Sequence, residues 1–167
     1  MSRGFVKEDD QEEIPMVPPR ADLPDGVANY VTPAGMNELL AEKKALSDEK
    51  NNLDISNENE KRIASNYINA KLQLLNNRIA EARIVNLSEQ PLDEIRFGAT
   101  IKLRIEASNK IHALQIVGVD EANFSKGKIS FTSPLSRALI NKKVGERALL
   151  KRDRDELAFE IMDITYK

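Results

Sequence analysis

The chain has 167 residues, of which 41% are hydrophobic and 31% charged, as suits one modest domain or two small ones. Lys and Arg total 25 against 27 Asp and Glu, so the net charge of −2 provides no overall field toward nucleic acid or an anionic membrane. There is no Cys and a single His, His112, which excludes disulfides, thiolate metal sites and a histidine cluster. Aromatic residues make up 5% of the chain, which argues against a stacking platform for single-stranded nucleic acid.

The first thirty residues predict a flexible tail. They contain a dense acidic run and most of the prolines, and they show neither helical nor strand periodicity. The opening "MSRGFVKEDDQEE" lacks the apolar core of a signal peptide, and no apolar run approaches the roughly 20 residues of a membrane helix. We therefore expect a cytoplasmic protein and assign no chemistry to residues 1–30.

A first helix is predicted to follow the tail. Thr32 suits the N-cap and Pro33 the first helical position. Leu39, Leu46 and Leu53 then recur seven residues apart. A helix of about 20 residues would span roughly 30 Å.

A second helix is predicted from "KRIASNYINAKLQLLNNRIAEARIV", in which apolar residues alternate at spacings of three and four. Two such stripes with a short polar link favour an antiparallel hairpin over residues 31–86, because each helix buries the stripe of the other. The alternative is two helices of an ordinary bundle. It is less favoured because the sequence that follows is strand-like.

The link between the helices, "LDISNENEK", gathers Asp54, Glu58 and Glu60. Asp, Asn and Ser are common in such turns because their short side chains cap helix ends. The second interpretation is that the turn is the functional end of an arm.

From Pro91 onward, period-two runs predict an α+β domain over residues 91–167. The five runs are "ATIKLRIEA", "KIHALQIVGV", "GKISFTS", "ERALLKR" and "LAFEIMDITYK", with one short helix between the third and the fourth. His112 falls within the second run, where we expect a half-exposed strand residue rather than a catalytic base.

The region around the short helix combines charge with apolar residues. Arg137, Lys142 and Lys143 lie beside Leu135 and Leu139, a mixture that suits a protein interface with an apolar centre and a charged rim. The alternative is that both leucines belong to the core and the charges to a solvated face.

Four segments of the second half, "RFGATIKL", "QIVGVDEAN", "KGKISFTSPLSRALINKKVGE" and "LAFEIMDITYK", resemble the C-terminal domain of the bacterial Gre transcript-cleavage factors, in order and in spacing. The hairpin between "YVTPAG" and "RIAEARIVN" is similar to their N-terminal coiled coil. The resemblance covers about residues 30 to 167.

The resemblance implies a factor that binds RNA polymerase. An FKBP-like C-terminal domain would grip the rim of the secondary channel, and the coiled coil would enter it. The acidic tip, here Asp54 and Glu58, would help to hold a Mg²⁺ ion shared with the polymerase, so that water cleaves backtracked RNA. The chain would then be no enzyme and would bind no cofactor alone. It would act as a monomer and meet nucleic acid only within the elongation complex.

The tip departs from the family pattern of Asp followed three residues later by Glu-Asn. Here Asn57 stands three residues after Asp54, and the pair Glu58 and Asn59 comes one residue late, a rotation of about 100° on a helix. The arm is also shorter than is usual in the family. Two outcomes remain open, stimulation of RNA cleavage and regulation at the secondary channel without cleavage.

Two functions of other classes are weaker alternatives. One is a peptidyl-prolyl isomerase, for which the domain offers only five aromatic residues: Phe97, Phe124, Phe131, Phe159 and Tyr166. The other is a coiled-coil adaptor that does not bind polymerase.

Overall fold

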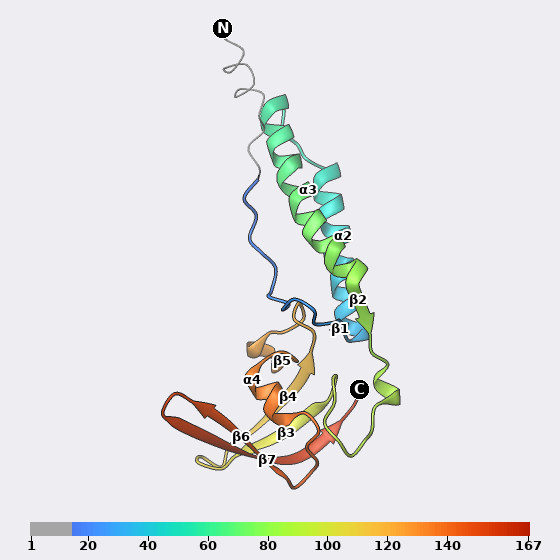
Figure 1. Cartoon of the computed structure of the whole chain (residues 1–167). Helices are drawn as coiled ribbons and strands as arrows, with labels where there is room; N and C mark the ends of the chain where they lie inside the picture. Colours follow the sequence, from blue (N-terminus) through green and yellow to red (C-terminus); the bar gives the residue numbers. More distant parts are fainter. Residues whose placement is uncertain (1–14) are drawn as a thin grey trace.

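Two helices project from a small domain built on a sheet (Figure 1). The structure is a computed structural model and describes residues 15–167, so the part of the predicted tail in residues 1–14 lies outside the described residues. Helix α2 spans Pro33–Asn51 and helix α3 spans Glu58–Glu81. They lie side by side and are joined at the end far from the sheet, and we call them the helical arm (Figure 1).

Helix α2 begins where the sequence predicts. The Thr32 hydroxyl oxygen accepts a hydrogen bond from the Gly35 backbone N–H at 2.9 Å, and Pro33 occupies the first turn, where no N–H is needed. Leu39 is buried against Leu75 of α3, whereas Leu46 and Leu53 are only half-buried. The apolar contact between the helices therefore weakens from the base of the arm toward its tip.

A two-stranded parallel sheet closes the base of the arm. Strand β1, Asn29–Val31, precedes α2 and pairs with strand β2, Ala82–Ile84, which follows α3. Strand β1 begins inside the stretch that was predicted to be tail. This strand could not be predicted from periodicity, because it has only three residues and its parallel partner lies more than fifty positions away.

The second half of the chain folds around a mixed sheet of five strands in the order β5-β4-β3-β7-β6. The strands are β3 Thr100–Ile105, β4 Ile111–Val117, β5 Lys128–Ser130, β6 Arg147–Arg152 and β7 Asp155–Thr165. Strands β4 and β5 are parallel and the other neighbours antiparallel. Short 3-10 helices, Leu87–Glu89 and Phe124–Lys126, lie in the connections. The predicted α+β class is confirmed.

One face of the sheet and the short helix α4, Pro134–Leu139, enclose the main core. Alternation explains the burial in β3, where Ile101 and Leu103 are buried and Lys102 is exposed. His112 is exposed in β4. Within residues 15–167, no helix has both the length and the apolar character needed to cross a membrane.

Candidate functional site

The tip of the arm is the connection between α2 and α3. At the end of α2 the Asn52 N–H donates to the Asp48 carbonyl oxygen at 3.0 Å. At the start of α3 the Asn57 side-chain oxygen accepts from the backbone N–H groups of Asn59 and Glu60, at 2.9 and 3.0 Å. Helix capping therefore explains the Asn57 side chain, whereas Asn52 contributes only its backbone N–H to the end of α2.

Capping does not explain Asp54 and Glu58. Both are exposed, and within residues 15–167 neither carboxylate has a hydrogen-bond or ion-pair partner. Glu58 is the first residue of α3, where the helix dipole favours a negative charge. In the same part of the chain, no three His, Asp or Glu side chains form a group that could hold a metal ion.

The predicted surface around α4 divides into exposed charges and buried leucines. Arg137 and Lys143 are exposed, and Lys143 Nζ lies 3.8 Å from Asp93 Oδ2. Lys142 is half-buried, and its carbonyl oxygen accepts a hydrogen bond from the Ile95 N–H at 2.9 Å. The three cations therefore lie at or near the surface.

Leu139 requires a correction, because its side chain is completely buried in the main core and so is not available to a partner. Leu135 is half-buried and packs against the same core. The exposed apolar side chains of this region are Leu92 and Val144, 77% and 53% exposed, beside the paired residues Glu94 and Lys143. Sequence reasoning missed both, because each stands alone in a connection without periodicity.

Asp120 joins the arm, the C-terminal domain and the segment before β1. It follows β4, and its carboxylate accepts hydrogen bonds from Arg20 at 3.1 Å and from Arg78 of α3 at 3.2 Å. Arg20 also donates to Glu42 of α2 at 2.7 Å, and Arg78 donates to the Ala21 carbonyl oxygen at 2.6 Å. The side chain of Asp120 is only 8% exposed, so these charge-assisted bonds are shielded from water.

The next residue, Glu121, forms a second connection between arm and domain. Its carboxylate accepts the Thr32 hydroxyl at 2.5 Å and the Lys128 ammonium at 3.1 Å, and its side chain is 3% exposed. Thr32 therefore caps α2 with its oxygen and donates its proton to the domain. We call Asp120, Glu121 and their partners Arg20, Thr32, Arg78 and Lys128 the junction.

Three comparisons relate this chain to known proteins. Residues 89–166 match the family model "Transcription elongation factor, GreA/GreB, C-term". Transcription elongation factor GreA of Maricaulis maris is 31% identical over 125 residues, which cover 73% of this chain and 80% of that protein. The chain belongs to the GreA/GreB family.

Two further similarities are with a second GreA protein and with a solved structure. GreA of Pelobacter propionicus is 39% identical over 101 residues, covering 60% of this chain and 64% of that protein. The solved structure of a GreA/GreB factor from Nitrosomonas europaea covers 84% of this chain and 99% of that one, at 18% identity and a TM-score of 0.42.

The GreA/GreB family model covers the α4 surface and three junction residues, Asp120, Glu121 and Lys128, and excludes the tip of the arm. From the sequence, Thr32 was predicted only to cap α2, and no role was predicted for Asp120 or Glu121. The sequence contains one usable signal, a pair of carboxylates directly after an apolar strand. The partners of these two carboxylates lie between 7 and 100 positions away in the sequence. Hydrophobic periodicity does not predict which side chains pair over such separations.

Proposed function

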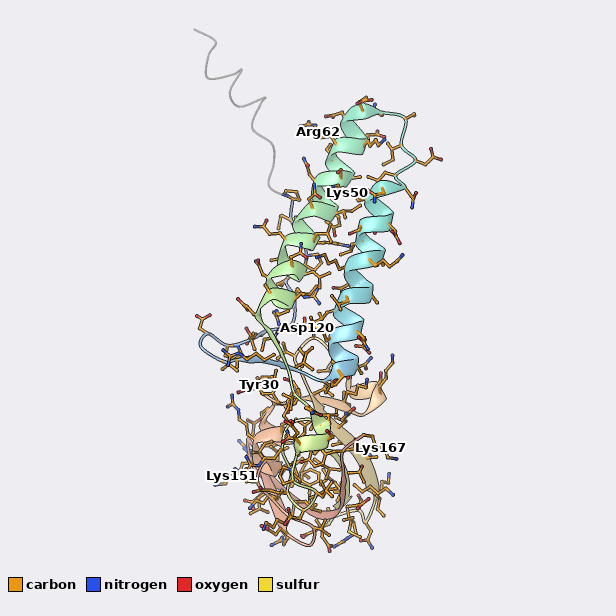
Figure 2. All side chains as sticks on the ribbon, turned by 90° about the vertical axis from the view of Figure 1, so that its right-hand side faces the viewer. Tyr30, Lys50, Arg62, Asp120, Lys151 and Lys167 are labelled. Carbon is orange, nitrogen blue, oxygen red and sulfur yellow. The ribbon has the colours of Figure 1, made fainter. Side chains whose placement is uncertain are left out.

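We propose that this protein is a transcription elongation factor that binds RNA polymerase at the secondary channel and acts on backtracked elongation complexes. Membership of the GreA/GreB family supports this function. The observation that carries it is the arm, which projects from the domain (Figure 2). At its far end it bears Asp54 and Glu58, two exposed carboxylates without a hydrogen-bond or ion-pair partner among residues 15–167. In this proposal the cleavage activity belongs to the polymerase, and the protein is not itself an enzyme.

The two halves of the chain have different roles in this proposal. Residues 91–167, as an FKBP-like domain, dock at the rim of the channel through Arg137, Lys142 and Lys143. Residues 31–86, as an antiparallel coiled coil, enter it. The protein acts in the cytoplasm as a monomer and meets nucleic acid only within the elongation complex.

The tip contributes oxygen ligands. Asp54 and Glu58 would supply carboxylate oxygens to a Mg²⁺ ion shared with the polymerase active site, a donor type that this hard cation prefers. Two carboxylates would leave the remaining coordination positions to polymerase and water. A second metal can orient the attacking water and neutralise developing charge.

A second function at the same place is regulation without cleavage. Helix α2 has only 19 residues, about 29 Å, and Asp54 lies in the connection whereas Glu58 lies on α3. An arm of this length would occupy the channel and exclude cleavage factors even where the two carboxylates miss the metal.

One experiment separates the two functions. Purified protein is added to backtracked elongation complexes of its own organism, and RNA length is measured. Stimulated cleavage that disappears in the Asp54→Ala, Glu58→Ala double variant, while polymerase binding persists, supports the metal-ligand role; Glu81→Ala, an exposed carboxylate at the other end of α3, is the control. Binding and competition without cleavage support the regulator. An absence of polymerase binding contradicts both functions.

The docking surface has its own test. Charge reversal at Arg137 and Lys142 should weaken polymerase binding while the fold, followed by circular dichroism, is retained. Unchanged affinity would remove this surface from the proposal.

The alternatives of other classes are tested with the same protein. Phe97, Phe131 and Tyr30 pack against one another with ring centroids 5.6 to 5.9 Å apart, and Phe159 is buried, so these rings contribute to packing. We expect no acceleration of proline isomerisation. Recovery of polymerase subunits in a pull-down from native cytosol would argue against the adaptor.

A further inference from the structure

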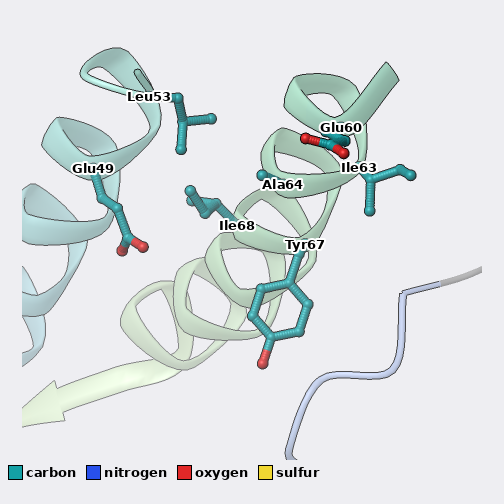
Figure 3. Close-up of a pocket in the computed structure, with 7 residues that line it drawn as sticks. All are labelled: Glu49, Leu53, Glu60, Ile63, Ala64, Tyr67 and Ile68. Carbon is teal, nitrogen blue, oxygen red and sulfur yellow. The ribbon is translucent and has the colours of Figure 1, made fainter. Parts of the chain in front are cut away.

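Close to its tip the arm contains an apolar groove that neither the acidic turn nor the junction uses. It is a cavity of about 370 Å³ between α2 and α3, which we call the tip groove. Its lining residues are Glu49 and Leu53 from the α2 side and Glu60, Ile63, Ala64, Tyr67 and Ile68 from α3. Figure 3 shows Leu53 and Ile68 facing one another across the space between the helices, with Ile63 and Tyr67 one turn apart on α3.

The apolar lining of the tip groove is unusually accessible. Ile68 is 3% exposed, whereas Ile63 is 58% and Tyr67 37% exposed. A single exposed apolar side chain is ordinary, but several around one hollow are typical of a contact surface. Among residues 15–167, the short apolar stripe of α2 does not cover Ile63 at this level of the arm.

Charge at the rim restricts what can bind. Glu49 and Glu60 line the tip groove on either side, and within residues 15–167 neither carboxylate has an ion-pair partner. Asp54 and Glu58 add negative charge at the adjacent turn. Two nearby cations have contacts of their own: Lys71 lies over the Tyr67 ring at 4.7 Å, and Arg62 donates a hydrogen bond to the Asn59 side-chain oxygen at 2.8 Å. The acidic run of the chain's own N-terminus, "EDDQEE", has the wrong sign for this rim.

We propose that the tip groove binds a segment of RNA polymerase that inserts an apolar side chain between Ile63 and Tyr67 and places Lys or Arg against Glu49 and Glu60. This inference rests on the proposed function, because the arm must reach the polymerase. Burial of the exposed apolar surface favours binding, and the two carboxylates select a basic segment. The groove thereby holds the tip in position, a role distinct from the metal-directed role of Asp54 and Glu58.

The test measures the affinity of full-length protein for core polymerase of the same organism at several salt concentrations. We expect Ile63→Ser to weaken binding about tenfold, the loss typical of a buried apolar contact at an interface. Leu40→Ser is the control, because Leu40 is 45% exposed on α2 but lies outside the groove. Glu49→Gln with Glu60→Gln, which preserves side-chain shape, should reduce the salt dependence of binding.

The outcomes distinguish the two proposals. Polymerase binding by the unaltered protein with equal affinity for Ile63→Ser would overturn the groove inference and leave the proposed function intact. No polymerase binding by the unaltered protein would contradict the proposed function first. A variant that lacks residues 1–14 provides a third measurement. If this deletion and Ile63→Ser tighten polymerase binding equally, the groove is covered by the chain's own N-terminus and the inference is wrong.

Discussion

The base and the tip of the arm both contain closely spaced carboxylates, in opposite surroundings. At the base, Asp120 and Glu121 are largely buried and accept hydrogen bonds from Arg20, Arg78, Thr32 and Lys128. At the tip, Asp54 and Glu58 are exposed and have no described partner. A buried carboxylate must be compensated by nearby donors, whereas an exposed one keeps its coordination positions free. The base carboxylates therefore fix the arm, and the tip carboxylates remain available to a partner.

The largest expected effect comes from removing a base carboxylate. Glu121→Ala takes away the acceptor of the Thr32 hydroxyl and the Lys128 ammonium, so we expect the free energy of unfolding to fall by about 3 kcal/mol. Glu58→Ala makes the same change at the tip and should cost about 0.5 kcal/mol, through the helix dipole alone. Urea denaturation of both variants measures the difference. Equal losses would contradict the contrast between base and tip.

A glycine at the base tests how closely the arm and domain approach. A Cβ atom on Gly118 would lie 2.5 Å from the Tyr30 carbonyl oxygen, so Gly118→Ala should cost about 2 kcal/mol of stability by displacing β1. Gly26 has a φ of +79° but nothing within 4 Å of its Cβ position. Gly26→Ala should therefore cost only about 1 kcal/mol, from backbone strain. A thermal melt that ranks the two variants in the reverse order would rule out the close approach.

A smaller effect is expected for Arg20, which connects Glu42 of the arm with Asp120 of the domain. Arg20→Ala should lower stability by about 1 kcal/mol, because Asp120 retains Arg78 as a donor. Amide hydrogen exchange should become faster in the first turns of α2 and stay unchanged at the tip. Uniform acceleration along the arm would instead indicate global destabilisation.

The smallest effect concerns Glu106, a carboxylate of intermediate exposure that does have a partner. Arg147 donates two hydrogen bonds to Glu106, at 2.6 and 2.8 Å, and this lowers the pKa of Glu106. A lowered pKa in the folded state adds stability above the pKa of the unfolded chain, and that stability is lost as the pH falls through the folded value. In Arg147→Ala the pKa of Glu106 should rise toward its ordinary value. NMR titration measures it, with Arg137→Ala as the control that should leave it unchanged.

Local patterns predicted those parts of the fold that local forces determine. Thr32 and Pro33 mark the start of α2 because a cap requires only neighbouring residues, and alternation marked β3 because each side chain faces one side of a single sheet. Leu139 was ambiguous because a helix of six residues is too short for its buried face to be read from spacing. The structure resolves that ambiguity in favour of the core.

Contacts between residues far apart in the chain could not be predicted from the sequence. The partners of Asp120 and Glu121 include residues 100, 42 and 89 positions away, so their pairing depends on the finished fold. The tip carboxylates were conspicuous for the opposite reason. They lie within one short turn, where neighbouring acidic residues can be seen directly in the sequence.

The parallel pairing of β1 with β2 also has a consequence for chain entropy. Asn29 pairs with Ala82, so the two ends of the segment that contains the whole arm meet. The pairing therefore closes this segment into a loop. The entropic cost of closing a loop grows only logarithmically with its length, by about 0.6 kcal/mol for each doubling. Equal numbers of helical turns can therefore be added to or removed from α2 and α3 with little change in the entropic cost of closing the loop. The reach of the arm can change across homologues or designed variants while the base that aims it stays the same.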